Sequence, residues 1–376
     1  MNFKELSNEE FYSNYFIQLL QDKFDVIRSN EPDFLIYVPP VWHCMNYDCV
    51  RIFFTPENLR TDWNIADYGI DFDFMEFNDR HCRFPVGFIR GDRDKIMKRH
   101  LIGDEEINNK IKYNKFCAFM VSNSKPPTSD MRDMCFELLS EYKKVDSGGL
   151  FRNNVGGRIG NKLEWLKDYK FHLCFENSTY PGYLTEKLFD AFSAGCVPIY
   201  WGDTSLRISL DSENDHIESH CTKGGGGNFS HQYVNIDMTI PRIPKHLIEY
   251  HLNPKAFINA HNFPTLRDLI EEIKRMDNDH EAYKAMLREP VFLDNFNPFI
   301  EQENKLKSFL ESICSQEPKN AFRRGEAIHL TDHRTRMEKN YNLPHLLKYY
   351  KLAKKINNIL SWRTIPRDLI KKYKLK

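Results

Sequence analysis

The sequence lacks the features of a membrane-spanning protein and of a secreted protein held together by disulfides. No stretch of the chain approaches the roughly eighteen uninterrupted apolar positions that a transmembrane helix needs. The first residues form an acidic, amphipathic segment, MNFKELSNEEFYSNYF, so we expect no secretory signal. The nine cysteines are odd in number and lack the paired spacing of a zinc site. We therefore expect free, mostly buried thiols in a reducing compartment.

The chain also has no net charge, because 53 lysines and arginines balance 53 aspartates and glutamates. This balance argues against a protein built to bind nucleic acid. The charge is uneven, however, since residues 345–376 carry ten lysines and arginines against the single Asp368. A basic helix with one apolar stripe suits an anionic membrane surface. The alternative is a helix that packs this stripe on the body of the protein. The apolar positions at helical spacing are Leu346, Tyr349, Ala353, Ile356 and Leu360.

Apolar runs and turn residues alternate along the rest of the chain and predict an α/β protein. Strands that alternate with helices are typical of doubly wound parallel sheets. We expect two Rossmann-like domains, residues 1–115 and 116–315, with a ligand-binding cleft between them and C-terminal helices at 316–376. Residues 211–250 are predicted to form an inserted loop. The predicted strands are 33–38, 50–54, 116–121, 171–175 and 197–201, and the predicted helices are 104–113, 131–142 and 183–194.

The segment 171–203 carries the most informative chemistry. A predicted strand ends at Glu176 and Asn177, and a helix opens with Thr185-Glu186-Lys187. Helix N-termini attract anions, and Lys187 adds a positive charge suited to a phosphate. Glu186 would repel a phosphate and is better suited to accept hydrogen bonds from sugar hydroxyls. Together these features predict a nucleotide-sugar site, although an isolated Thr-Glu-Lys is more often an ordinary helix start.

This segment resembles the donor-binding motif of the α1,3-fucosyltransferases, especially their bacterial branch. The shared pattern is Phe-x-Leu-x-Phe-Glu-Asn at 171–177, Tyr-x-Thr-Glu-Lys at 183–187 and Val-Pro-Ile-Tyr-Trp-Gly at 197–202. Further similar blocks lie at 53–58, 64–70, 119–132, 145–149 and 253–259. The resemblance implies the GT-B arrangement, with the acceptor bound by the first domain and GDP-fucose by the second. It implies inverting transfer of L-fucose that requires neither a metal nor a further cofactor.

The resemblance also implies residue roles. Glu57 corresponds to the general base, and an inverting transfer needs such a carboxylate to take the proton of the attacking hydroxyl. The leaving GDP departs as a phosphate and needs positive charge, which Arg132 and Lys187 would supply. Asn177, Tyr183 and Glu186 match donor-pocket positions, with Glu186 on the fucose hydroxyls. Pro56 stands where the family often has glycine, which stiffens the loop but leaves Glu57 in place.

The Asp71-Phe72-Asp73 sequence matches the Asp-x-Asp metal motif of another glycosyltransferase architecture. Three residues are a weak pattern, and their alternation also suits a half-buried strand. We therefore expect no metal site there.

The resemblance implies an acceptor of the N-acetyllactosamine type, fucosylated at O3 of N-acetylglucosamine, as in lipopolysaccharide with Lewis-type antigens. The choice between O3 and O4 stays open. The expected location is the cytoplasm, with the basic tail against the inner face of the plasma membrane. Two alternatives are a transferase for another nucleotide sugar and a catalytically silent protein that binds glycans or nucleotides.

Overall fold

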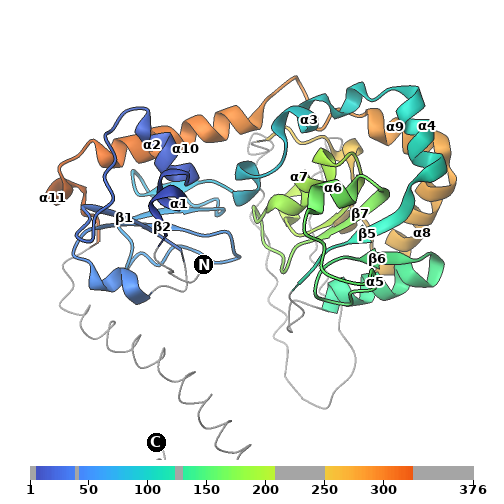
Figure 1. The fold of residues 1–376 in the computed structure, drawn as a ribbon, viewed down its shortest axis with the longest axis horizontal. Helices are drawn as coiled ribbons and strands as arrows, with labels where there is room; N and C mark the ends of the chain where they lie inside the picture. The colour runs from blue at the N-terminus through green and yellow to red at the C-terminus, as the bar shows by residue number, and fades with distance from the viewer. Residues whose placement is uncertain (1–5, 39–41, 123–129, 208–249, 325–376) are drawn as a thin grey trace, which may run out of the picture.

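The computed structural model of the protein describes residues 6–38, 42–122, 130–207 and 250–324. The predicted basic tail at 345–376 and nearly all of the insertion at 211–250 lie outside these residues. Two parallel sheets stand side by side (Figure 1), so the prediction of two Rossmann-like halves is confirmed. In the described part of the chain, no helix is both long and apolar enough to cross a membrane.

The first half is a parallel sheet of four strands in the order β1-β2-β3-β4. Every residue of β2 is buried, because its Val, Ile and Phe side chains serve a sheet that is covered on both faces. The predicted strands 33–38 and 50–54 are confirmed as β1 and β2. The elements of this half are α1 (Asn8–Tyr12), α2 (Tyr15–Gln21), β1 (Phe34–Tyr37), η1 (Trp42–Asn46), β2 (Val50–Phe54), β3 (Tyr68–Asp71), β4 (His81–Arg83) and η2 (Val86–Ile89).

A helical segment then leads into the second half, a parallel sheet of five strands in the order β6-β5-β7-β8-β9. The connecting elements are α3 (Arg93–Lys98), η3 (Arg99–Leu101) and α4 (Asp104–Tyr113). The strands are β5 (Lys115–Phe119), β6 (Val145–Ser147), β7 (Tyr169–Phe175), β8 (Val197–Trp201) and β9 (Ile258–Asn259). The helices are α5 (Asp130–Tyr142), α6 (Lys162–Leu166), α7 (Glu186–Ser193), α8 (Leu266–Asn278) and α9 (His280–Arg288).

The predicted strands and helices of the second half are confirmed to within two residues at each end, except for a larger shift at the start of α7. The prediction began this helix at residue 183, whereas Thr185 is its N-cap and Glu186 its first residue. Gly182 explains the shift, because its φ of +84° keeps the preceding chain in a turn. The helix ends before Gly195 as predicted, and Gly195 has a φ of +72°.

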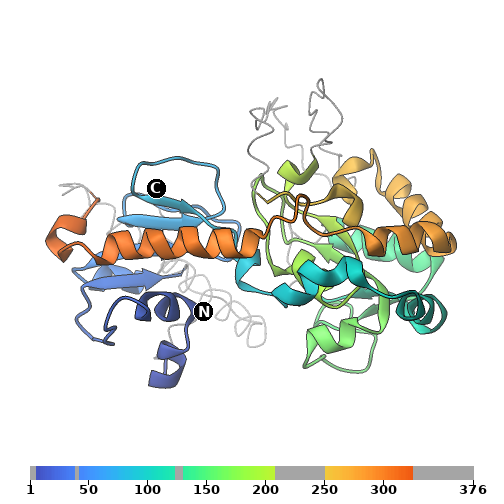
Figure 2. The ribbon, with the colours of Figure 1, turned by 90° about the horizontal axis from the view of Figure 1, so that it is seen from above.

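The long helix α10 (Pro298–Cys314) returns to the first half and packs against α2, β4 and η2 (Figure 2). The predicted division at residue 315 had assigned this segment to the second half. The Glu303 carboxylate accepts hydrogen bonds from Tyr15 Oη at 3.0 Å and from Arg93 at 2.7 Å. Beyond α11 (Pro318–Ala321), the buried Asp67 carboxylate accepts from the backbone N–H groups of Arg323 and Arg324 at 2.9 Å. The end of the described chain is therefore fastened to the first sheet.

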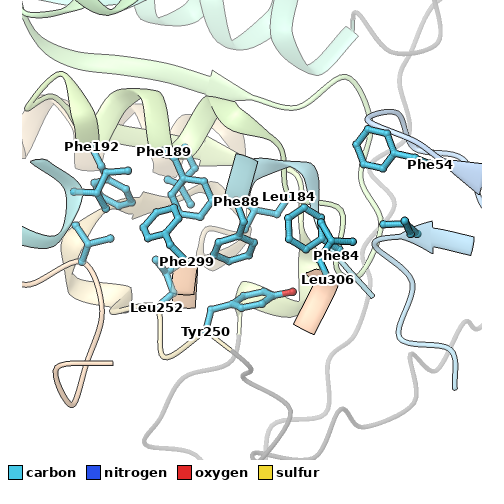
Figure 3. Packing of buried hydrophobic residues seen from close by; sticks show 14 of the residues in the cluster. Phe54, Phe84, Phe88, Leu184, Phe189, Phe192, Tyr250, Leu252, Phe299 and Leu306 are labelled. Carbon is cyan, nitrogen blue, oxygen red and sulfur yellow. The ribbon is translucent and has the colours of Figure 1, made fainter. Parts of the chain in front are cut away.

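One apolar core continues from the first half into the second. Phe88 of η2, Phe189 of α7 and Phe299 of α10 meet in its centre (Figure 3). The centroid of the Phe299 ring lies 5.6 Å from that of Phe88 and 5.4 Å from that of Phe189. Seven of the eight described cysteines are buried and none of the eight forms a disulfide, as expected. The halves are thus joined by packing as well as by the chain.

Truncation of Phe299 should destabilise the protein strongly, because this ring is 1% exposed where three segments meet. We expect Phe299→Ala to lower the free energy of unfolding by about 3–5 kcal/mol in denaturant titrations. Ile300→Ala is the matched control, because the next side chain on the same helix is 56% exposed. Equal losses for the two variants would contradict the role given to this packing.

Candidate active site

The topology of the second sheet marks the place where a ligand should bind. From β5 the chain first adds β6 on one side and then β7 on the other, so the strand order reverses between β5 and β7. Ligands of open α/β sheets bind outside the carboxyl ends of the strands at such a point. Helix α5 with Arg132 follows the loop after β5, and Asn177 is the second residue after β7. Two predicted donor residues are therefore placed by the switch point.

Glu176, which sequence analysis left without a role, organises the turn from β7 to α7. Its carboxylate is 0% exposed and accepts from the N–H and the hydroxyl of Thr185, both at 2.8 Å. It also accepts from Lys187 Nζ at 2.9 Å. A Cβ at Gly202 would lie 2.3 Å from Glu176 Cγ, so only glycine leaves room for this carboxylate. The sequence signal for this role is the spacing between the Phe-Glu-Asn and Thr-Glu-Lys segments, because the glutamate of the first segment bonds to the threonine of the second.

Lys187 and Glu186 lie in the first turn of α7, where the prediction placed them. Burial works against the charge of Lys187, but Glu176 and Glu186 outweigh it and raise the pKa of this ammonium. Burial likewise opposes the charge of Glu186, whereas Lys187 and Lys162 lower its pKa to about 2. The Glu186 side chain is 37% exposed and reaches Lys187 Nζ at 3.4 Å. Glu186 is thus an ionised, accessible carboxylate, and Lys187 shares its charge with two carboxylates.

Arg132 is buried beside this turn. Its Nε and Nη2 donate to the carbonyl oxygen of Phe175 at 3.1 and 2.9 Å, so the end of β7 fixes the guanidinium. No hydrogen bond to a described residue uses its Nη1. Burial lowers the pKa of Arg132, and nearby Glu176, Tyr183, Glu186 and Glu57 act in the opposite direction. Arg132 therefore lies within the field of the other predicted site residues.

Glu57 reaches this site from the other half of the molecule. It follows β2, and its N–H donates to Thr55 Oγ1 at 3.0 Å, which shapes the loop. Its exposed carboxylate accepts from Asn177 Nδ2 at 2.8 Å. The structure thus brings the predicted base and a predicted donor residue into direct contact, a pairing that sequence analysis did not foresee.

Tyr183, which is also predicted for the donor pocket, lies buried at the same junction. It is 2% exposed, and its ring packs edge-on against Phe72 of the first half, with centroids 5.1 Å apart. Burial and the neighbouring Glu176 raise the pKa of its hydroxyl. Tyr183 therefore joins the two halves through its ring.

Asp71 has a structural environment. Its Oδ2 accepts from the Thr61 N–H at 3.0 Å and the Thr61 hydroxyl at 2.6 Å, and its Oδ1 accepts from Asp73 N and His81 Nε2, both at 2.9 Å. Burial opposes its charge, but the contact with His81 lowers the pKa of the carboxyl. Asp73 instead pairs with Arg60 at 2.8 Å. Over the described ranges, no group of three or more potential metal-ligating side chains is found.

The lowered pKa of Glu186 makes a pH-dependent prediction. Because the folded-state pKa is about 2 and the ordinary value is 4.5, the stabilisation by ionised Glu186 is complete above pH 4.5 and is lost as the pH falls toward 2. The difference in unfolding free energy between wild type and Glu186→Gln should therefore shrink between about pH 7 and about pH 3. Denaturant titrations across this range measure it, and a constant difference would contradict the assignment.

Family models match both halves of the chain. Residues 1–89 match the N-terminal domain of the α-(1,3)-fucosyltransferase FucT, and residues 110–218 match the C-terminal part of glycosyltransferase family 10, the fucosyltransferases. A crystal structure of an α1,3-fucosyltransferase with GDP-fucose is similar at 25% identity and a TM-score of 0.56, over 82% of this chain and 88% of that one. A structure with GDP gives 25% identity and a TM-score of 0.57 over the same shares.

Individual relatives agree with these matches. The α-(1,3)-fucosyltransferase FucT of Helicobacter pylori is 26% identical over 75% of this chain. A putative fucosyltransferase of Acanthamoeba polyphaga mimivirus is 29% identical over 48% of it. The chain spans 57% of the first relative's length and 24% of the second's. Because the two domain models lie in order and together cover more than half of the residues, the chain belongs to glycosyltransferase family 10, the fucosyltransferases.

Proposed function

We propose that the protein is an inverting α1,3-fucosyltransferase that uses GDP-fucose. The observation that carries this proposal is the hydrogen bond between Glu57 and Asn177, which joins an exposed carboxylate of the first half to a proposed donor residue of the second. This carboxylate lies across the junction from the turn between β7 and α7, which carries the cations. Such an arrangement suits the transfer of a glycosyl group from a diphosphate. The similar structure with GDP-fucose supports the choice of donor.

The donor diphosphate would bind at the start of α7. The free N–H groups of this helix and its dipole favour negative charge. Arg132 supplies a guanidinium fixed by the Phe175 carbonyl, and Lys187 supplies an ammonium held by Glu176. These cations would stabilise the charge that develops on GDP as it leaves. The chemistry proposed here needs no metal and no further cofactor.

The fucose would lie between this diphosphate and Glu57. Glu186 is ionised and accessible, which suits it to accept hydrogen bonds from the sugar hydroxyls. Glu57 would take the proton of the acceptor hydroxyl as its oxygen bonds to the anomeric carbon. The bond from that carbon to the phosphate oxygen breaks on the opposite face, so the β-linked donor gives an α-linked product.

The proposed acceptor is a glycan with an N-acetyllactosamine-type end, fucosylated at O3 of N-acetylglucosamine. The Helicobacter pylori relative is named for α-(1,3) transfer. A human relative with 29% identity over 46% of this chain is named a 3-galactosyl-N-acetylglucosaminide 4-α-L-fucosyltransferase. Linkage analysis of the product on both disaccharide isomers decides between O3 and O4. We further propose that the glycan belongs to lipopolysaccharide with Lewis-type antigens and that the enzyme acts in the cytoplasm, with residues 345–376 against the inner leaflet.

Replacement of Glu57 by glutamine should abolish turnover and spare donor binding. The amide keeps the shape of the side chain but cannot accept a proton, so we expect kcat to fall by about 10²–10⁴-fold. Acceptor-dependent GDP release from GDP-fucose measures kcat, and calorimetry measures the Kd of GDP-fucose. An undiminished rate would remove Glu57 as the base. Wild-type protein that binds no GDP-fucose but binds another nucleotide sugar would sink the donor assignment, and donor binding without turnover would indicate a silent binding protein.

Loss of the Lys187 charge should slow the departure of GDP. We expect Lys187→Ala to lower kcat/KM by about 10²–10³-fold, while Lys187→Arg retains more activity because the charge remains. Lys284→Ala on α9 is the matched control, since that lysine pairs with the exposed Glu281 at the surface. GDP release at fixed acceptor concentration measures all three. Equal rates for Lys187→Ala and Lys284→Ala would contradict a role in leaving-group stabilisation.

A further inference from the structure

The loop after β2 and the loop after β7 pair with each other residue by residue. Glu57 bonds to Asn177 and Asn58 bonds to Ser178, each at 2.8 Å. Arg60 places its guanidinium carbon 4.0 Å from the ring centroid of Tyr180. In each pair the partners are 120 positions apart in the sequence, so the two loops run side by side in one register. We call these three pairs the loop bracket.

The two hydrogen bonds of the loop bracket and one bond within the loop after β7 form a directed series that ends on the Glu57 carboxylate. Asn58 Nδ2 donates to Ser178 Oγ, and Ser178 Oγ donates to Asn177 Oδ1 at 3.0 Å. Asn177 Nδ2 then donates to Glu57 Oε2. Because an ionised carboxylate can only accept, the direction of the series and the orientation of the Asn177 amide are fixed together. Bonds linked in this way polarise and strengthen one another.

Two residues in this series of hydrogen bonds have no part in the proposed chemistry. Asn58 and Ser178 carry no charge, and both are partly buried between the loops. Each is bonded to a residue of the opposite half, so neither loop can move without stretching the contact. The neighbouring Arg60 is held on its other side by Asp73 Oδ2 at 2.8 Å. The loop after β2, which carries Glu57, is therefore fixed by contacts on both sides of Asn58.

We propose that Asn58 and Ser178 are positioning residues, which hold the Glu57 carboxylate at the acceptor hydroxyl through Asn177. The proposal rests on the proposed function, because it takes Glu57 as the base and GDP-fucose as the donor. Asn177 also lies in the proposed donor pocket, so its amide must serve the substrate as well. The Asn58–Ser178 bond keeps the two loops in register while the Asn177 amide contacts the substrate.

A double-mutant cycle in the full chain tests this inference. Asn58→Ala, Ser178→Ala and the double variant are compared with wild type at saturating GDP-fucose and N-acetyllactosamine. A misplacement of the base of about 1 Å can cost up to about 100-fold in rate. We expect each single change to lower kcat about 10-fold and the double change to lower it about 10-fold as well, because residues of one network do not act additively. Ser178→Thr keeps a hydroxyl and should recover most of the rate.

Controls separate positioning from folding and from donor binding. Ser312→Ala and Asn278→Ala alter exposed side chains on α10 and α8, and their kcat should equal that of wild type. Asn58→Ala should keep the Tm of these controls and bind GDP-fucose within about two-fold of wild type. The inference is overturned if both single variants keep wild-type kcat, or if the double loss is the product of the single losses. It is also overturned if Asn58→Ala loses GDP-fucose affinity as much as rate. Full activity of Glu57→Gln would overturn both the assignment of Glu57 as the base and this inference. If Glu57→Gln is inactive but the Asn58 and Ser178 variants keep wild-type kcat, only this inference is overturned.

Discussion

The site depends on one buried carboxylate. Glu176 has no exposed surface, and the Thr185 N–H, the Thr185 hydroxyl and Lys187 Nζ all donate to it. An ionised carboxylate without such partners could not stay buried, since its desolvation costs several kcal/mol. Satisfying Glu176 therefore holds Thr185, the N-cap of α7, against the end of β7 and closes the turn between these two elements. That turn places Asn177 at the end of the strand and Glu186 and Lys187 in the first turn of the helix.

The second constraint is that both halves present loop ends to the same junction. Strands β2 and β7 belong to parallel sheets, so the loops that follow them lie at the carboxyl edges, where ligands of such folds bind. The contact of Glu57 with Asn177 and the packing of Phe72 on Tyr183 join these edges. Elsewhere α10 and the Phe299 cluster hold the halves together through apolar packing. The proposed base on one half and the proposed donor site on the other thereby share a defined geometry.

Much of this architecture could be predicted because it is written in local patterns. The strand at 50–54 and the helix at 104–113 match β2 and α4 residue for residue, since apolar runs and helical spacing are local properties. The two-residue strand β9 and the short β4 are too brief to show a period. The path of α10 could not be foreseen, because its buried stripe does not say which half it will cover. The start of α7 was misplaced because Gly182 keeps the preceding chain in a turn, which leaves Thr185 to serve a carboxylate nine positions earlier.

The candidate site likewise divides into features that local motifs predict and features that only the folded chain shows. Roles for Glu57, Arg132 and Lys187 could be predicted from motifs. The contact of Glu57 with Asn177 joins positions 120 apart, so it could be seen only in the folded chain. Glu176 was missed because a buried glutamate that only orders its neighbours resembles a solvated one in the sequence. Asp71 showed the converse, since a motif that resembles a metal site is filled by Thr61, His81 and a backbone N–H.

The most direct test of the account is the product formed by wild-type protein from GDP-β-L-fucose and N-acetyllactosamine. Nuclear magnetic resonance identifies the anomeric configuration and the linkage of the transferred sugar. The account predicts an α-linked fucose on the acceptor and one GDP released for each linkage formed. A β-linked product would contradict the inverting mechanism, and the absence of any transfer with bound GDP-fucose would contradict the proposed activity.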